Sequence, residues 1–443
     1  MINLISGIDY LLLIIYSVVI FYCLKRFFFR DLNPVLSKIF AIFFFLKILA
    51  VLTYTLLVVY YWQLADSVSV FSETKNLTGL IQADISNIKY LFLPVENYNA
   101  LVNLDMSLKS IPGGSGIESN YFLTRVCTIL YPVSLGKYLL LNFWFGVIST
   151  IAQFKLYLVL LKVYPQIKDK LAICILFIPT LLFYASPIYK ETLCLSFLCF
   201  IIELIYNIRN DKKNLFSFIL VLVNLFFIFL LKSYIFYALM ISCAFVFIGR
   251  FLRRLFSASL FGKFSVFMFL AAVAYLISQN LDIFDSYIYS LIDISNLNQQ
   301  FYGPTSDTSS FEFGEIETSF AGLLTKMPLG LYTCYFRPHL WEINKPILLL
   351  SAVESFLCFW TLFYALVKKG RNFTAVLRKN LLTNIMFLFV LILGIIIGIT
   401  TFNFGTLVRY KAPAVPFLWI FIFLLLSSSN PKESTFKEEA LAD

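Results

Sequence analysis

Charged side chains stand next to the ends of the long apolar segments of this chain, and their types suit phosphate and sugar chemistry. Carboxylates that could deprotonate a hydroxyl group or hold a metal ion are Asp66, Glu191 and Glu342. Cations that could bind a phosphate or pyrophosphate group are Lys190, Lys232, Arg337, Arg409 and Lys411. These residues lie far apart in sequence, so only the fold can bring them together.

The most distinctive short segment is Phe336–Glu342, with the sequence FRPHLWE, directly before an apolar run. Trp341 could stack on a sugar ring, although an aromatic belt at the membrane interface is the commoner role of tryptophan. His339 is the one histidine of the chain, so we expect a loop histidine rather than a metal ligand. Each interfacial cation, taken alone, could also serve only to anchor a helix end.

Composition places these residues in a membrane protein. The chain has 443 residues, of which 60% are hydrophobic and 14% charged, and its mean hydropathy is +0.85. A soluble domain is about a quarter charged. The formal charge of +10 falls in short basic clusters between apolar runs, which is the pattern of positive-inside topology and not of nucleic-acid binding.

Apolar runs long enough to cross about 30 Å of hydrocarbon predict an all-α, polytopic bundle of about eleven transmembrane helices. They lie at 8–29, 36–62, 138–163, 170–186, 191–208, 214–231, 234–250, 264–280, 347–367, 380–401 and 412–428. Threading them through a bilayer collects the basic loops on one side, which predicts an external N-terminus and a cytoplasmic C-terminus. Two long acidic connections, 63–136 and 281–346, are then extracytoplasmic, residues 1–428 form the transmembrane domain, and 429–443 form a disordered cytoplasmic tail.

The same threading gives specific expectations for charged and amphipathic segments. Asp66, with the carboxylates and cations named above, falls at the outer interface. Lys47 and Glu203 fall toward the cytoplasmic parts of their spans, where we expect snorkelling or local pairing and no site at the membrane midplane. In the first external loop, the stretch Ile88–Ile111 predicts an amphipathic helix at the interface.

Three segments carry a family resemblance: ADSVSVF at Ala65–Phe71, YASPIYKET at Tyr184–Thr192 and RYKAPAVPF at Arg409–Phe417. Together they resemble polytopic bacterial envelope-polysaccharide proteins, the GT-C-like glycosyltransferases and the Wzy-type O-antigen polymerases. The resemblance implies an enzyme of the bacterial cytoplasmic membrane that transfers a sugar at the outer face. The donor would be a polyprenyl-phosphate-linked sugar, and the acceptor a glycan or glycolipid.

On this resemblance, Asp66 would be the base for the acceptor hydroxyl, with Glu342 or Glu191 as rivals. The phosphate of the donor would bind to the cations, which are Arg337, Arg409, Lys190, Lys232 and Lys411. Whether a divalent metal takes part is left open. Membrane lipids are expected partners and nucleic acid is not.

Two other functions remain open. A transporter or flippase of lipid-linked sugars should show polar residues or broken helices near the midplane, and of these the sequence offers only Pro179 as a candidate break. A non-catalytic scaffold of an envelope machine would use its external loops as binding surfaces. No nucleotide-binding or zinc motif is present.

Overall fold

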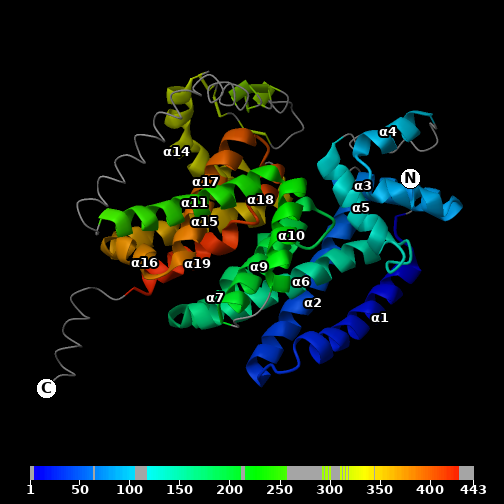
Figure 1. Ribbon diagram of the computed structural model, residues 1–443, viewed down its shortest axis with the longest axis horizontal. Helices are drawn as coiled ribbons and strands as arrows, with labels where there is room; N and C mark the ends of the chain where they lie inside the picture. The colour runs from blue at the N-terminus through cyan, green and yellow to red at the C-terminus, as the bar shows by residue number, and fades with distance from the viewer. Residues whose placement is uncertain are drawn as a thin grey trace. The chain divides into compact units, whose positions relative to one another are not determined.

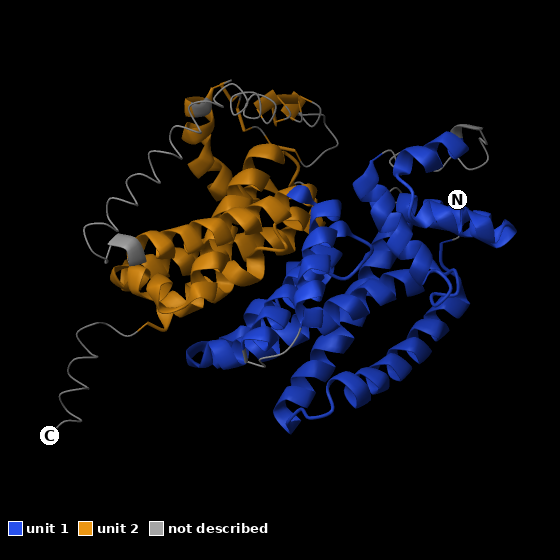
Figure 2. Cartoon of the chain, viewed as in Figure 1, with its two compact units in different colours: residues 1–233 blue, residues 234–443 orange. Residues whose placement is uncertain are grey.

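All regular elements that the structure describes are helices (Figure 1). The computed structural model describes residues 4–62, 65–104, 117–210, 215–256, 319–343 and 345–428, with 292–293, 295–297, 299–300, 310–311, 313–314 and 316–317. The chain divides into two compact units, residues 1–233 and 234–443 (Figure 2). Each unit is described by itself.

Unit 1 is built on helices α2, α6 and α9, which pack in succession, and α1 and α10 add to α6 and α9. Short helices α3 and α5 pack on each other in the region between α2 and α6. Its elements are α1 (Gly7–Cys23), η1 (Leu24–Phe28), α2 (Pro34–Leu57), η2 (Val58–Trp62), α3 (Asp66–Ala83), η3 (Ile85–Leu91), α4 (Val95–Leu104), α5 (Glu118–Leu130), α6 (Tyr138–Val163), η5 (Pro165–Ile167), α7 (Lys168–Ile175), α8 (Pro179–Tyr184), α9 (Lys190–Asn210) and α10 (Leu215–Leu231).

Unit 2 centres on α14, α15, α17 and α19, with α14 against α17 and α15 against α19. Its elements are α11 (Ser233–Phe256), which begins at the unit boundary, α14 (Phe320–Phe336), η6 (Leu340–Glu342), η7 (Pro346–Leu348), α15 (Leu349–Lys369), η8 (Gly370–Asn372), α16 (Phe373–Lys379), α17 (Leu381–Thr400), α18 (Phe404–Tyr410) and α19 (Val415–Leu426). Two glycines of α17, Gly394 and Gly398, let α14 approach closely, because a Cβ at Gly398 would overlap the carbonyl of Gly330.

Asparagine side chains start several of these helices. Asn33 accepts a hydrogen bond from the backbone of Leu36 at 2.8 Å, and Pro34 follows in the first helical position of α2. Asn380 begins α17 and Asn403 begins α18 in the same way. The helix starts are therefore encoded locally, next to the apolar runs.

The long apolar helices identify a multi-pass membrane protein. Seven helices of the described residues are long and apolar enough to cross a membrane, or eight if α18 and α19, which meet at 67°, form one bent span. The seven are Gly7–Phe28, Pro34–Trp62, Tyr138–Val163, Lys190–Arg209, Ser233–Arg253, Pro346–Lys379 and Leu381–Thr400. Each coincides with a predicted span, whereas the total of eleven and the orientation stay predictions.

The remaining predicted spans differ in kind. The expected span 170–186 is a broken helix, because α7 ends at Ile175 and α8 begins only at Pro179. The expected span 214–231 is the 17-residue helix α10. The span 264–280 and the tail 429–443 lie outside the described residues.

The two expected external loops contain helices. In the first, the amphipathic helix predicted at 88–111 is wrong in its described part: η3 ends at Leu91, a break follows, and α4 begins at Val95 beside Pro94. Proline prefers a helix start to a helix interior, which explains the break. In the second, α14 packs along α17.

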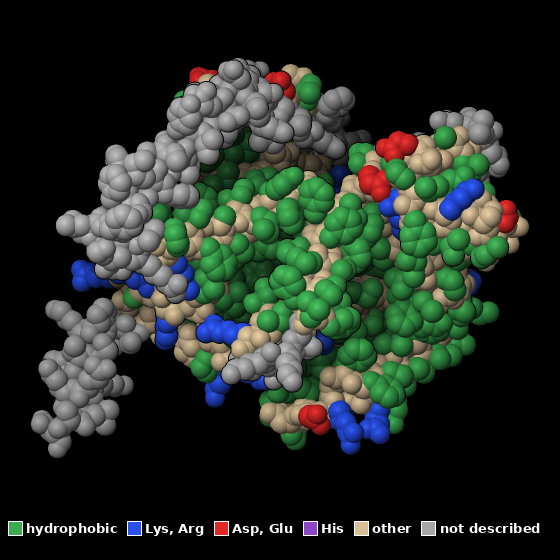
Figure 3. Space-filling model, viewed as in Figure 1, with side chains coloured by type: hydrophobic (Ala, Val, Ile, Leu, Met, Phe, Trp, Pro, Cys, Tyr) green, Lys and Arg blue, Asp and Glu red, His purple; other side chains and the backbone are tan. Residues whose placement is uncertain are grey.

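The surface agrees with a lipid environment. Large hydrophobic side chains are widely exposed, including Phe27 at 78% and Leu215 at 77%. In Figure 3, hydrophobic side chains cover most of the visible face of unit 1, and charged side chains gather toward its ends. An apolar surface of this extent is unfavourable in water and is the surface that a bilayer covers.

Candidate functional site

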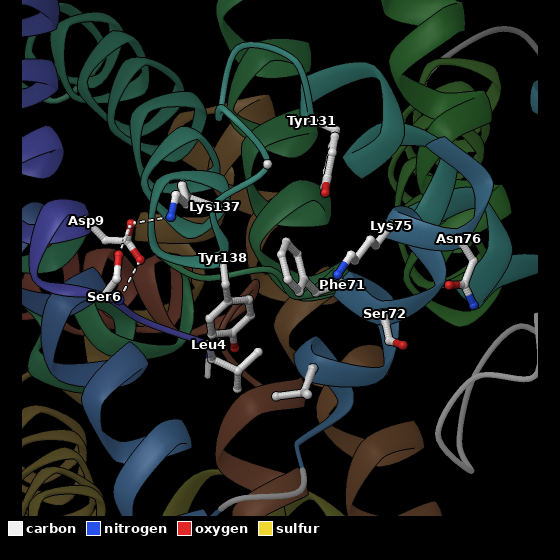
Figure 4. Close-up of a pocket in the computed structure, with 12 residues that line it drawn as sticks. Leu4, Ser6, Asp9, Phe71, Ser72, Lys75, Asn76, Tyr131, Lys137 and Tyr138 are labelled. Atoms are coloured by element: carbon white, nitrogen blue, oxygen red, sulfur yellow. Dashed lines mark hydrogen bonds and ion pairs between the residues drawn. The ribbon is translucent and has the colours of Figure 1, made fainter. Parts of the chain in front are cut away.

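Unit 1 contains a pocket of about 380 Å³ where the start of α1, one face of α3 and the turn between α5 and α6 meet (Figure 4). Its lining combines charged groups, hydroxyls, an amide and aromatic rings. The lining residues are Leu4, Ser6, Asp9, Val68, Phe71, Ser72, Lys75, Asn76, Tyr131, Gly136, Lys137 and Tyr138. Polar groups among aromatic rings in a concave site are the general features of a small-molecule binding site.

An ion pair holds one side of this pocket. Asp9 is buried in the first turn of α1, where its carboxylate accepts hydrogen bonds from the backbone N–H and the Oγ of Ser6, both at 2.9 Å. The Nζ of Lys137 lies 3.1 Å from the same carboxylate. The Asp9 carboxylate therefore already has three partners. Ser6 holds the carboxylate in place, and the carboxylate in turn holds the Lys137 ammonium group at the pocket wall.

Helix α3 presents one face to the pocket. Val68, Phe71, Ser72, Lys75 and Asn76 follow the three- and four-residue spacing that places side chains on one side of a helix. Figure 4 shows the Lys75 ammonium group beside Phe71, directed toward the open space. Among the described residues, no carboxylate lies within ion-pair distance of Lys75, whereas Lys137 is paired with Asp9.

The turn before α6 needs the backbone freedom of glycine. Gly136 has φ +65°, and a Cβ there would lie 3.0 Å from the Tyr131 hydroxyl oxygen. The turn is closed by hydrogen bonds from the backbone N–H groups of Ser134 and Gly136 to the Tyr131 carbonyl. This geometry places Tyr131 and Lys137 on the same pocket.

A chain of hydroxyl groups runs from the pocket into α2. The hydroxyl of Tyr138 lies 2.7 Å from the Oγ of Ser67, which lies 2.7 Å from the hydroxyl of Tyr54. All three side chains are fully buried. This satisfied network ties the start of α3 to two transmembrane helices and so fixes the pocket wall.

Among the sequence-predicted site residues of unit 1, Glu191 and Lys232 form a buried ion pair. The Lys232 Nζ lies 2.9 Å from the Glu191 Oε1, and the two side chains are 8% and 2% exposed. Lys190 donates to the Oγ of Ser119 at 2.7 Å. Asp66 is exposed and is the first residue of α3, where a negative charge is favourable. None of these four residues lines the pocket.

In unit 2, Arg337 and Glu342 bind each other. The Nε of Arg337 donates to both carboxylate oxygens, at 2.9 and 3.2 Å, and Nη2 donates to Oε1. The guanidinium group also lies over the rings of Phe311 and Phe404, 4.3 and 5.4 Å from their centroids. The group expected to grip a phosphate is thus held by a carboxylate and two rings.

The pair of Arg337 and Glu342 shifts the pKa values of Glu342 and His339 in this loop. Burial alone would raise the pKa of Glu342, but hydrogen bonds from Arg337 and from the His339 backbone, with the Arg337 charge, lower it below the ordinary value. Burial lowers the pKa of His339, and the Glu342 charge opposes this. The His339 ring stacks on Trp341 at 4.6 Å and its Nε2 lies 3.2 Å from the Tyr332 hydroxyl.

The remaining predicted residues of unit 2 divide between buried and exposed positions. Lys411 is buried, and its Nζ donates to the Arg337 carbonyl and the Ser355 Oγ, both at 3.2 Å. The guanidinium group of Arg409 lies 5.3 Å from the centroid of the Tyr410 ring. Trp341 is 79% exposed, a position open to a sugar or to lipid. Arg337, Glu342 and Lys411 therefore form one cluster through side-chain and backbone contacts.

Sequence reasoning missed the pocket residues Asp9, Lys75 and Lys137. Asp9 and Lys137 stand at the start of predicted spans, so the criterion used for the other interfacial charges would have included both. Nothing in the sequence indicates that they pair, because 127 residues separate them. Within the described parts of the chain, no group of three His, Cys, Asp or Glu side chains could hold a metal ion.

For Lys47 we expected snorkelling or local pairing, and snorkelling is wrong. Lys47 is 0% exposed and donates to neutral oxygen atoms inside unit 1. Local pairing is confirmed for Glu203, whose Oε1 lies 3.3 Å from the Lys155 Nζ.

No protein-family model, curated protein or solved structure matches this chain, so its function is inferred from the geometry above.

Proposed function

We propose that this protein is a membrane glycosyltransferase or polysaccharide polymerase that uses a polyprenyl-phosphate-linked sugar at the outer face of the bacterial cytoplasmic membrane. The pocket of unit 1 would hold the sugar and phosphate head group of the donor. The observation that carries the proposal is the lining of this pocket, where the ammonium group of Lys75 lies beside the Phe71 ring and the rest of the lining supplies hydroxyls, an amide and further aromatic rings.

The chemistry of the lining supports this ligand class. A lysine ammonium binds phosphate oxygens through charge-assisted hydrogen bonds. Asn76, Ser72 and the Tyr131 hydroxyl can exchange hydrogen bonds with sugar hydroxyls, and the ring of Phe71 offers an apolar face. Lys137 lies on the opposite wall, where its charge is already paired with Asp9, so Lys75 is the cation that the pocket offers to a phosphate.

The position of the pocket agrees with the proposed topology. The start of α1, α3 and the turn before α6 all belong to segments that the charge distribution assigns to the outside. We propose Asp66, at the first residue of the helix that lines the pocket, as the base for the acceptor hydroxyl. The other predicted carboxylates, Glu191 and Glu342, lie on helices that do not line the pocket and remain rival candidates.

The test is a Lys75→Ala variant in a cell that depends on this protein for its surface glycan, and as purified protein with a panel of polyprenyl-phosphate- and polyprenyl-diphosphate-linked sugars. A hydrogen bond to a charged group contributes about 1.5–3 kcal/mol, so we expect glycosidic bond formation to fall about tenfold or more.

The matched control is Lys89→Ala, which removes an exposed lysine of η3 that lies outside the pocket lining. This variant should keep the wild-type rate. The proposal fails if Lys75→Ala, present at the wild-type level, makes glycan at the full rate. It also fails if the purified wild-type protein only moves the lipid-linked sugar across a vesicle membrane and forms no new bond.

A further inference from the structure

Lys47 is a buried cation near the middle of a transmembrane helix. It lies close to the centre of the 29-residue span Pro34–Trp62, and its side chain is 0% exposed. At 1.5 Å per residue each end of this helix is about 20 Å away, farther than a lysine side chain reaches. The ammonium group cannot reach the membrane surface, and the protein itself must solvate it.

Three oxygen atoms provide this solvation. Nζ of Lys47 donates to the Ala185 carbonyl at 2.8 Å and to the Oγ of Ser149 at 3.2 Å. The Gln153 amide, oriented so that both its ends find partners, accepts from Nζ at 3.0 Å and donates to the Ile175 carbonyl at 2.9 Å. An ammonium group has three donors, and all three are satisfied here.

Two of the carbonyl groups in this cluster come from the ends of the broken helix. Ile175 is the last residue of α7 and borders the break, whereas Ala185 directly follows α8, in the connection to α9. Non-helical backbone at membrane depth is tolerated only where protein or a water-filled cavity surrounds it. Unwound carbonyls and half-helix C-terminal ends are the groups that bind small cations in discontinuous transmembrane helices.

The charges around Lys47 are unusual for a buried lysine. Among the described residues no carboxylate lies within ion-pair distance of its Nζ, in contrast to Lys232 and Lys155. The Cys199 thiol of α9 lies near the Lys47 ammonium group. The ring of Phe43, on the same helix as Lys47, has its centroid 5.7 Å from Nζ. Its hydrogen-bond partners are the neutral hydroxyl and amide groups of α6 and the carbonyl group that follows α8.

A purely structural role does not explain this arrangement well. Moving an ammonium ion out of water costs several kcal/mol, and a well-packed apolar side chain is often at least as stable in such a position. Ionisable residues inside a membrane bundle mark functional sites more often than packing sites. The geometry is that of an oxygen-lined cation site in which the cation is attached to the chain.

We propose that Ser149, Gln153 and the Ala185 carbonyl form a monovalent-cation site beside the end of α8, linked through the Gln153 amide to the break after α7, and that the Lys47 ammonium group is its resident cation. The ammonium group joins α2 and α6 to the end of α8, while the Gln153 amide joins α6 to the end of α7. Withdrawal of the cation therefore releases the broken helix, and water enters beside it. This site does not depend on the proposed glycosyltransferase activity.

Two native cysteines report on such an opening. Cys174 on α7 and Cys199 on α9 are both 0% exposed. In the full-length protein in detergent, a water-soluble maleimide followed by mass spectrometry of the labelled peptides measures their reactivity. We expect Lys47→Met to label Cys174 and Cys199 at least tenfold faster than wild type. The control Lys155→Met, which removes the lysine paired with Glu203, should leave both rates unchanged.

Cation replacement tests the site itself. Lys47→Ala leaves the oxygen atoms without their cation, so NaCl should slow cysteine labelling toward the wild-type rate, whereas choline chloride at the same ionic strength should not. Wild-type labelling should be the same in both salts. If Lys47→Met does not fold, Ser149→Ala removes one of the three oxygens and should give an intermediate rate.

Two results would overturn the proposal. One is folded Lys47→Met and Ser149→Ala proteins that label at the wild-type rate, which would show that the ammonium group does not hold the break closed. The other is a Lys47→Ala protein that labels equally fast in sodium and choline, which would show that the oxygen cluster is not a cation site.

Discussion

The buried pair of Glu191 and Lys232 allows stability measurements to separate a structural role from a catalytic one. The side chains are only 2% and 8% exposed, and with 2.9 Å between the charged atoms each ion compensates for the burial of the other. Breaking a buried pair by removing one partner costs about 3–5 kcal/mol. For a unit of this size, about 2–4 °C of melting temperature corresponds to 1 kcal/mol, so Glu191→Gln should lower the unfolding midpoint by about 10 °C.

The assay is thermal unfolding of the detergent-purified protein, followed by tryptophan fluorescence. A double variant, Glu191→Leu with Lys232→Met, removes both charges and should recover most of the loss, because apolar residues often replace a buried pair at little cost. The comparison pair is Lys155 and Glu203, which are 3.3 Å apart and 31% and 15% exposed. Glu203→Gln should cost only about 1 kcal/mol or less.

Two outcomes would refute this reasoning. A Glu191→Gln protein that unfolds at the wild-type temperature but loses product formation at least tenfold would give Glu191 the catalytic role. A double variant as unstable as Glu191→Gln alone would show that the stability loss does not come from an uncompensated charge on Lys232.

Two further predictions concern unit 2. Gly398→Ala should destabilise the protein by about 3 kcal/mol, because its Cβ would overlap the carbonyl of Gly330. The control is Gly249→Ala on α11, whose Cβ meets no atom within 4 Å and which should be neutral or stabilising. Equal unfolding temperatures of the two variants would contradict this prediction. The pKa of Glu342 is lowered in the folded state, so the ionised carboxylate stabilises the fold fully above the ordinary pKa of 4.5 and loses this effect as the pH falls through the folded-state pKa. The difference in unfolding temperature between wild type and Glu342→Gln should therefore shrink from pH 6 to pH 3. A difference that stays constant over this range would count against the prediction.

The membrane spans were predictable because hydrocarbon thickness and hydrophobicity act on long stretches of sequence. The predicted span 138–163 has the bounds of α6, and 380–401 differs from α17 by one residue at each end. Local signals add to this, since Asn33 and Pro34 specify where α2 begins. The assignment to the multi-pass membrane proteins follows from the length and hydrophobicity of these segments alone.

The broken helix was only hinted at by the sequence. A run such as 170–186 has the composition of a span, and hydrophobicity reports composition without reporting whether the backbone stays helical. Pro179 permits a break after α7, and the Gln153 amide satisfies the Ile175 carbonyl that this break releases, while Lys47 satisfies the Ala185 carbonyl at the far end of α8. Those contacts join α2, α6, α7 and α8, and no local pattern encodes them.

The candidate site was the hardest part to predict, because the availability of a charge depends on its partner. Arg337 was expected to bind a phosphate, yet its guanidinium group is bound by the Glu342 carboxylate five residues along the chain. Lys232 and Glu191 are 41 residues apart and pair nevertheless. Residue types at the ends of the predicted spans were therefore a sound guide to charged clusters and a poor guide to which charges remain for chemistry.

A charge that is already paired contributes mainly to stability, since a ligand must first displace its partner. Two lysines of unit 1 differ from this pattern in opposite ways. Lys75 is exposed at the pocket and, within the described residues, has no carboxylate at ion-pair distance, so an anionic ligand can bind it without breaking an ion pair. Lys47 is buried and, within the described residues, is bound by neutral oxygens and no carboxylate, so its cation can leave without separating opposite charges. The first is suited to binding a ligand, and the second to a conformational change.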